Sequence, residues 1–347
     1  MLKKRDLSLD FLIIFISLLG LFSLLAINEQ YFKMQSYFLV VAIIAYVAIS
    51  FIPKNLVSLL VKSLYVLNII LLIYLFFFGK SIRGSTSWIT LGTINYQPAE
   101  FFKIITAYIT AEIVAKQESN KNIIKKIFMV FLIPLVLVVT QPDFGTFLIL
   151  FGIIFSIYFL AQMTKKRFLI ASAILLLSFS IGFTFLKPYQ KARITSFFKQ
   201  SDNNLEEGYN VQQAKIAVGS GGLFGKGFKG NTQVKLNFLP EAHTDFIFAA
   251  SAETFGLVYA LIIVCSLFLL IKKLKDYTFK EKIDIKTKYY AFGLLFIIFV
   301  QTFLNIGMNI GIMPVTGLTL PLISYGGTSL VTIFTGIALL QKLSWED

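Results

Sequence analysis

The sequence predicts an all-α protein that crosses a membrane about ten times. Of its 347 residues, 56% are hydrophobic and 14% are charged, whereas soluble domains average about 45–50% apolar and about 25% charged residues. The apolar residues form runs close to the length of about 20 that a membrane-spanning helix needs. The net charge of +14 arises largely in short segments between these runs, which is typical of membrane topology. A soluble domain, a disordered chain and a nucleic-acid-binding protein are therefore excluded.

The cysteine and histidine content limits the chemistry further. The chain has one cysteine, Cys265, and one histidine, His243. A disulfide framework, a thiolate zinc site and a histidine-rich metal centre are therefore not expected.

Ten apolar runs are the expected spans of a single membrane domain covering 1–347, with both termini in the cytoplasm. They are 9–27, 36–52, 57–78, 98–115, 125–141, 144–163, 168–186, 246–271, 289–311 and 318–341. Pro134 lies inside the fifth run, where neighbouring helices can satisfy the carbonyl that a proline frees.

The run 98–115 is the least apolar, because it contains Glu100, Lys103 and Glu112. If it did not span, the Lys165-Lys166-Arg167 cluster and the seven lysines of 272–288 would lie outside the cell. Basic residues of short loops favour the cytoplasmic side. The charge pattern therefore predicts that 98–115 is a span.

Two outer segments follow from this topology, 79–97 and 187–245. The second is 59 residues long, lies between the seventh and eighth spans, and carries eight basic and five acidic residues. Long loops are exempt from the positive-inside rule and are often functional, so these basic residues are available for binding.

A glycine-rich stretch at 219–230 invites comparison with nucleotide-binding loops. It does not fit a Walker loop, because Ser220 stands where the first glycine belongs and Gly227 follows Lys226. Its G-x-G-x-x-G spacing has no preceding strand. We expect instead a backbone that lies flat against a lipid or substrate surface, which glycine permits.

Several ionisable residues lie in or beside the spans. Glu100 and Lys103 are three residues apart, hence on one helix face, as a structural ion pair or as part of a substrate cavity. Asp143 precedes an apolar run and is expected as an N-cap. Glu253, about 12 Å into the eighth span, is expected as a hydrogen-bonded structural acid.

The densest polar cluster is 239–248, which closes the long outer loop at the membrane boundary. Glu241, His243 and Asp245 fall within five residues. An acid there can act as a general base. Alternatively, Thr244 or Asp245 only caps the eighth span.

These motifs together resemble the SEDS family, the RodA/FtsW group of peptidoglycan glycan-strand polymerases. The resemblance extends over nearly the whole chain and depends on Trp88-Ile89, on 97–103, on Gln141-Pro142-Asp143-Phe144-Gly145-Thr146, on 208–230, on 239–248, on Asn305-Ile306-Gly307-Met308 and on 321–327. The stretch 189–194 and the Asn305–Met308 motif are closer to the RodA-like elongation branch. One departure is Ser87, which stands where many relatives have arginine before the tryptophan.

The resemblance implies a lipid II polymerase that serves cell wall elongation and cell shape and releases undecaprenyl diphosphate. It implies Asp245 as the catalytic base and the following residues as substrate-binding: Trp88, Glu100, Lys103, Arg193, Glu241, His243 and Ser324. The charge on the leaving diphosphate requires stabilisation, for which Lys103 and the outer basic loop are the candidates. No cofactor is firmly expected, and a divalent cation (Mg²⁺ or Mn²⁺) is left open.

The resemblance also implies location in the bacterial cell membrane and partners, namely lipid II, the nascent glycan strand, membrane lipids and a class B penicillin-binding protein. Three other functions remain as alternatives. A lipid II flippase would move lipid without making polymer, and a non-enzymatic scaffold would tolerate loss of Asp245. An ion-coupled transporter is disfavoured because no second copy of any motif is found.

Overall fold

The computed structural model describes residues 5–79, 86–92, 94–162, 206–230, 232–236 and 238–345. Nine helices of at least 18 residues lie in this part of the chain. They are α1 (Leu7–Ile27), α2 (Glu29–Phe51), α3 (Lys54–Phe78), α4 (Pro98–Ala115), α5 (Asn120–Thr140), α6 (Phe144–Gln162), α12 (Ile247–Phe279), α13 (Ile285–Asn309) and α14 (Gly327–Ser344). The predicted span 168–186 and Arg193 lie outside the described residues.

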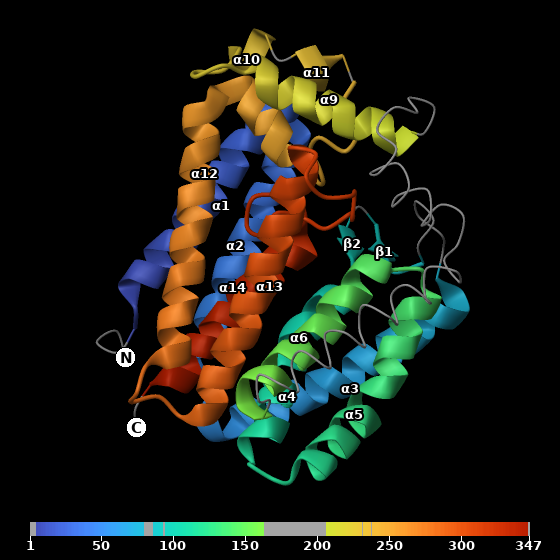
Figure 1. Ribbon diagram of the computed structural model, residues 1–347, viewed down its shortest axis with the longest axis vertical. Helices are drawn as coiled ribbons and strands as arrows, with labels where there is room; N and C mark the ends of the chain where they lie inside the picture. The colour runs from blue at the N-terminus through green and yellow to red at the C-terminus, as the bar shows by residue number, and fades with distance from the viewer. Residues whose placement is uncertain are drawn as a thin grey trace.

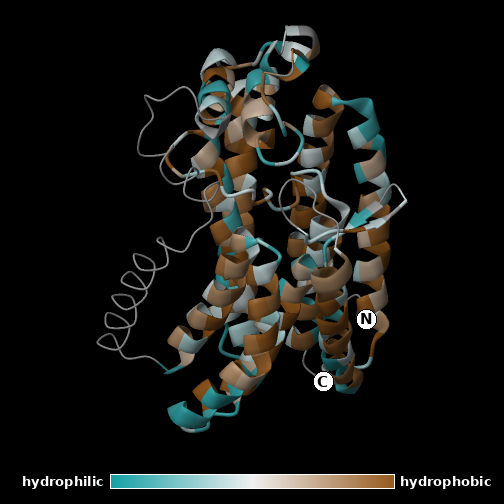
Figure 2. Cartoon of the chain, turned by 90° about the vertical axis from the view of Figure 1, so that its right-hand side faces the viewer, coloured by the Kyte–Doolittle hydropathy of each residue, from teal (hydrophilic) through white to brown (hydrophobic). Residues whose placement is uncertain are grey.

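The long helices form one bundle, and both ends of the chain lie toward the end opposite α9 (Figure 1). Hydrophobic residues dominate the long helices, and hydrophilic residues gather toward the loops at the two ends (Figure 2). Seven of the helices found in the described part are long and apolar enough to cross a membrane. The prediction of a mostly helical multi-pass membrane protein is confirmed.

Helix α4 occupies exactly the predicted range 98–115 and packs against α3, α6, α13 and α14. Most of its side chains are buried by protein, so it does not need the hydropathy of a helix that faces lipid. Its Glu112 lies at the inner end, where it pairs with Lys62 (2.8 Å) and Lys286 (3.3 Å). Charge asymmetry thus located a helix that its composition alone leaves below the threshold for a span.

The prediction of a span over 318–341 is wrong at its start. Helix α14 begins at Gly327, and residues 310–326 form an irregular outer segment. The backbone takes left-handed φ angles at Gly311, Gly317 and Leu322, and Pro314 and Pro321 each lack an N–H donor. Residues 318, 320, 322 and 323 are buried although they are not helical, so hydropathy could not distinguish this segment from a helix.

Other boundaries differ by less. Helix α2 begins seven residues before the predicted 36, because Asn28 accepts the Gln30 N–H (2.7 Å) and caps it. Helix α12 continues to Phe279, beyond the predicted 271, and is broken at Gly256, where φ is 83° and ψ is −176°. No sequence signal had predicted this break.

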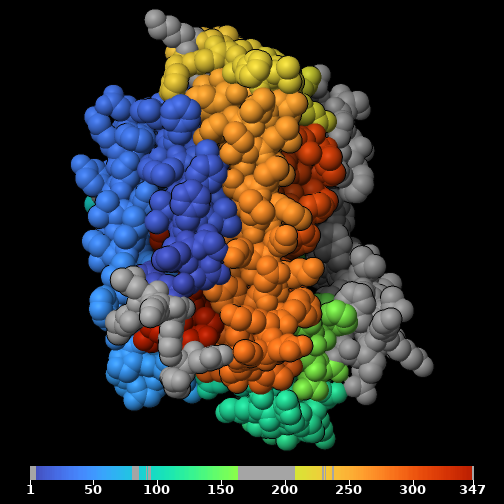
Figure 3. Space-filling model, turned by 90° about the vertical axis from the view of Figure 1, so that its left-hand side faces the viewer, coloured from blue at the N-terminus to red at the C-terminus, as the bar shows by residue number. Residues whose placement is uncertain are grey.

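The two segments predicted to lie outside, here called the outer segments, contain regular structure of their own. Within 79–97, β1 (Ile89–Leu91) and β2 (Ile94–Tyr96) form an antiparallel hairpin. Within 187–245 lie α9 (Glu206–Ser220), α10 (Gly227–Gly230) and α11 (Thr232–Lys235). Figure 3 shows the yellow α9–α11 region lying over the outer end of the orange α12, beside the blue α1. These outer elements position the site.

Candidate functional site

The segment 241–246 is fixed to the outer end of α13. The side-chain amides of Asn305 and Asn309 both donate to the backbone carbonyl of Asp245, each over 3.0 Å. Asn309 also accepts the Ala249 N–H of the first turn of α12 through its Oδ1 (2.9 Å). Both asparagines are fully buried, so they hold the backbone of Asp245 and the start of α12 in one place.

Helix α12 starts directly after this segment. Phe246 is the N-cap residue, and the helix begins at Ile247. Neither Thr244 nor Asp245 occupies the cap position, and the hydroxyl of Thr244 bonds instead to the carboxylate of Glu241 (3.1 Å). Phe246 therefore occupies the N-cap position for which the sequence offered Thr244 or Asp245, and the catalytic role of Asp245 stays a prediction.

His243 and Ser324 join the segment to the irregular stretch before α14. The His243 ring stacks on Tyr31 with centroids 4.0 Å apart and an interplanar angle of 5°. The backbone carbonyl of His243 accepts the Tyr325 N–H (2.9 Å), and the Ser324 hydroxyl donates to the Thr244 carbonyl (2.7 Å). The structure thus brings together four of the predicted site residues: Glu241, His243, Asp245 and Ser324. Ser324 is buried, and its hydroxyl also accepts the Leu320 N–H, which makes it a support for the loop.

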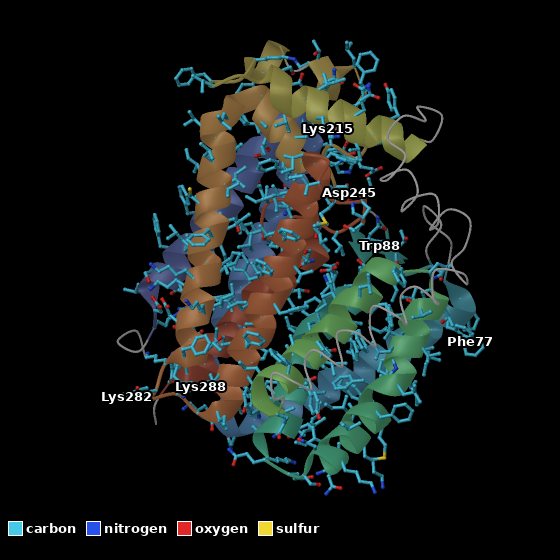
Figure 4. All side chains as sticks on the ribbon, in the orientation of Figure 1. Phe77, Trp88, Lys215, Asp245, Lys282 and Lys288 are labelled. Atoms are coloured by element: carbon cyan, nitrogen blue, oxygen red, sulfur yellow. The ribbon has the colours of Figure 1, made fainter. Side chains whose placement is uncertain are left out.

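Lys215 approaches the same region from α9. Its side chain crosses Gly311 so closely that a Cβ at 311 would lie 1.8 Å from Lys215 Cε and 2.6 Å from Nζ. Gly311 lies just beyond Asn309, which holds Asp245. Figure 4 shows Asp245 below Lys215, and Trp88 below Asp245, nearer the middle of the molecule. The basic outer loop therefore delivers a lysine close to the Asp245 segment.

Glu100 and Lys103 form a buried pair in a different place. Lys103 Nζ lies 2.6 Å from Glu100 Oε1, and their side chains are 1% and 11% exposed. They line a cavity of about 10 Å³ with residues of α13 and α14, roughly the space of one water molecule. Gln301 Nε2 and Thr332 Oγ1, from the same lining, are buried without a hydrogen-bond partner among the described residues. A water molecule bridging these groups is the simplest occupant.

Asp143 and Gln97 connect the outer ends of α4 and α6. Asp143 Oδ1 accepts the Thr146 N–H (3.1 Å), which confirms the predicted N-cap, and its Oδ2 accepts from Gln97 Nε2 (2.8 Å). Burial raises the pKa of the Asp143 carboxyl, and the nearby Glu100 carboxylate raises it further. Trp88 is half-buried and directly precedes the hairpin. The Thr328 hydroxyl of α14 donates to the Asn95 carbonyl of β2 (3.3 Å).

Sequence reasoning missed the supporting residues Tyr31 and Asn309, and it recognised Asn305 only as part of a family motif, without its supporting role. The two asparagines lie in an apolar span, where polar side chains are costly and usually functional, and that signal could have identified them. In the part of the chain that the structure covers, no three His, Cys, Asp or Glu side chains cluster as metal ligands.

The sequence profile of the FtsW, RodA and SpoVE proteins, described as "Cell cycle protein", matches residues 7–347. The chain belongs to this family. It is 37% identical over 305 residues to a probable peptidoglycan glycosyltransferase FtsW of Wigglesworthia glossinidia brevipalpis, covering 85% of this chain and 78% of the relative. It is equally 37% identical over 286 residues to the peptidoglycan glycosyltransferase MrdB of Escherichia coli K12, covering 81% and 76%.

Solved structures of similar proteins have the same fold. A chain from a study of a peptidoglycan synthase complex that coordinates polymerization and crosslinking matches with a TM-score of 0.83 and 26% identity, over 98% of this chain and 97% of the other. The rod shape determining protein RodA of Thermus thermophilus matches with a TM-score of 0.74 and 24% identity, over 99% and 98%. The membership that the motifs implied is confirmed.

Proposed function

We propose that this family member is a peptidoglycan glycosyltransferase that polymerises lipid II, with Asp245 as the general base. Its relatives named FtsW and MrdB carry the name of that activity and align over most of their length. The observation that supports the role of Asp245 is its fixation: two buried asparagines hold its backbone at the outer end of the bundle.

The reaction assigns a task to each neighbouring group. The acceptor hydroxyl of one lipid-linked sugar attacks the anomeric carbon of another, and the bond from that carbon to the diphosphate breaks. The acceptor's proton passes to the Asp245 carboxylate, and undecaprenyl diphosphate leaves with the bonding electrons. An ammonium group near the leaving oxygens stabilises the charge that develops on them.

Lys215 is better placed for that last task than Lys103. The Lys103 side chain is 1% exposed and paired with Glu100 inside the bundle. Lys215 lies on an outer helix and crosses Gly311 beside the Asp245 segment. We therefore assign diphosphate binding to Lys215, and substrate contacts to Glu241, His243 and Trp88 on the same outer side. The roles of Glu100 and Arg193 remain predictions from the resemblance.

The proposed partner is a class B penicillin-binding protein. The proposed location is the cell membrane, with both termini of the chain in the cytoplasm. The comparisons do not favour either family branch, since the FtsW and MrdB relatives are equally identical. The elongation role is therefore proposed from the 189–194 and Asn305–Met308 motifs alone.

Asp245→Asn tests the proposal with purified protein and lipid II in detergent. The asparagine side chain has nearly the same shape, and the bonds from Asn305 and Asn309 reach the backbone carbonyl, which the substitution leaves in place. Loss of a general base lowers the rate by about 10²–10⁴-fold, so glycan product should fall that far while thermal stability stays near that of the unmodified protein. Near-normal polymer formation by Asp245→Asn refutes the assignment. Lipid movement in vesicles without any polymer from the unmodified protein identifies a flippase instead.

A further inference from the structure

The glycine-rich segment after α9 is inserted against the break in α12. At Gly256, a Cβ would lie 2.4 Å from both Gly225 N and Leu223 O, so the two backbones touch. At Gly225, where φ is 80°, a Cβ would lie 2.2 Å from the Thr254 carbonyl oxygen. Only glycine allows an approach this close with such φ angles. The glycines serve contact between protein backbones, in place of the lipid or substrate surface expected from the sequence.

The inserted segment replaces the hydrogen bonds that the break removes from α12. Beyond the break, Leu257 N–H donates to the Gly222 carbonyl (2.9 Å) and Val258 N–H to the Leu223 carbonyl (3.2 Å). Before the break, the Glu253 carbonyl accepts the Lys226 N–H (2.9 Å). Buried backbone groups need such partners, above all at membrane depth. The outer loop is therefore part of the helix's own hydrogen bonding.

Glu253 fastens this insertion with its side chain. The residue is fully buried, and its Oε1 accepts from Lys226 Nζ (2.9 Å), Gln233 N (3.2 Å) and Thr232 Oγ1 (3.3 Å). Lys226 precedes α10, and Thr232 and Gln233 follow it, so one carboxylate bonds to the chain on both sides of α10. Truncating a buried acid with such partners leaves a lysine and a backbone N–H without theirs.

The part of α12 before the break carries the proposed catalytic segment at its other end. Residues 247–255 run from the Asp245 segment to Gly256, and Asn309 fixes their beginning through Ala249 N–H. Their inner face, Ala249 and Ala250, packs against Ala214 and Ala217 of α9, the helix that carries Lys215. Glu253 is about 12 Å along the helix from Asp245, and it ties α12 to Lys226, Thr232 and Gln233, which follow α9 in the chain.

We propose that Glu253 is a positioning residue for glycan polymerisation: by holding the glycine-rich segment in the break of α12, it sets Lys215 and Asp245 relative to each other. This inference rests on the proposed function. The role of Glu253 then goes beyond stabilising the fold, because its partners belong to the same outer segment, 187–245, that carries Lys215 close to Asp245. Misplacement of reacting groups by about 1 Å can cost as much as 100-fold in rate.

The test combines kinetics with a distance measurement in the full-length protein. Glu253→Gln and Lys226→Met are made singly and together, in a background that carries Ile216→Cys. Ile216 is an exposed residue of α9, and the native Cys265 is an exposed, free thiol of α12 beyond the break. Spin labels on these two thiols report how α9 sits against α12. Glu29→Gln, at an exposed ion pair on the outer side, is the matched control.

Each single variant should lower kcat about 10- to 100-fold with KM for lipid II within about two-fold, and it should broaden the label distance distribution. The double variant should be no worse than either single one, because both remove the same interaction. The control should match the parent in both measurements. An unchanged kcat, a fall in kcat with an unchanged distance distribution, or multiplying effects in the double variant each overturn the inference.

Two further outcomes stay distinguishable. If the protein with its native Ile216 makes no polymer from lipid II, the proposed function fails, while the distance distributions still report whether Glu253 holds the insertion. If Glu253→Gln does not fold, Thr232→Val removes one bond to Glu253 Oε1 and provides a milder change; parent-like kcat and distances in that variant overturn the inference.

Discussion

Removing Lys103 should destabilise the protein strongly, because it leaves the carboxylate of Glu100 buried. The two side chains are 1% and 11% exposed and their charged atoms are 2.6 Å apart. Breaking a buried ion pair by deleting one partner costs about 3–5 kcal/mol, whereas replacing both partners with uncharged residues is often neutral. We expect Lys103→Met to lose about 3–5 kcal/mol of unfolding free energy, and Glu100→Gln/Lys103→Met to lose about 1 kcal/mol or less.

The assay is denaturant unfolding in mixed micelles, followed by lipid II polymerisation on the same preparations. Lys33→Met is the control, because Lys33 and Glu29 form an exposed pair, 63% and 71% exposed, whose loss should not measurably change stability. If the double variant regains both stability and polymerisation, the pair is structural. If it regains stability only, the charges take part in substrate binding or reaction. Unchanged stability of Lys103→Met refutes the reasoning from burial.

Three further predictions concern the outer site. Asn309→Ala should lower the unfolding free energy by about 1–3 kcal/mol, because it leaves the buried Ala249 N–H without its acceptor, while Asn305 still donates to the Asp245 carbonyl; the same unfolding titration measures this, and a change below 1 kcal/mol contradicts this role. Gly311→Ala should displace the Lys215 stem and reduce polymer yield, and parent-like yield shows that Lys215 is not needed there. Because the pKa of Asp143 is raised in the folded state, its ionisation reduces stability as pH rises from about 3.9 through the folded pKa. Asp143→Asn should therefore be more stable than the parent at pH 7 and lose that advantage near pH 4, and a pH-independent difference contradicts the sign.

Local properties of the sequence predicted most of the bundle. The i, i+3 spacing of Glu100 and Lys103 predicted that they share a helix face, because helix geometry fixes neighbours at that separation, and the ion pair was one of the two expected arrangements. Asp143 before an apolar run was sufficient to predict a cap. The basic clusters predicted a helix over 98–115, where the structure has α4, since topology depends on charge summed over short loops.

Contacts between segments far apart in the sequence could not be predicted from such local properties. Residues 318–326 have the hydropathy of a span, yet they form a buried irregular segment whose polar groups bond to residues such as Gln35 and Thr244. The glycine-rich stretch was recognisable as permissive, but only the structure shows that its partner is the broken backbone of α12 at Gly256.

The sequence by itself determined that this is a helical membrane protein of the FtsW, RodA and SpoVE family with an acidic cluster at the outer boundary. Hydropathy, charge and motifs are properties of contiguous segments, so the sequence alone is enough to identify them. The tertiary structure decided that Asn305 and Asn309 hold Asp245, that Lys215 crosses Gly311, and that Glu253 joins the outer loop to α12. These are contacts between groups as much as 96 residues apart, and they exist only once packing has brought the helices together.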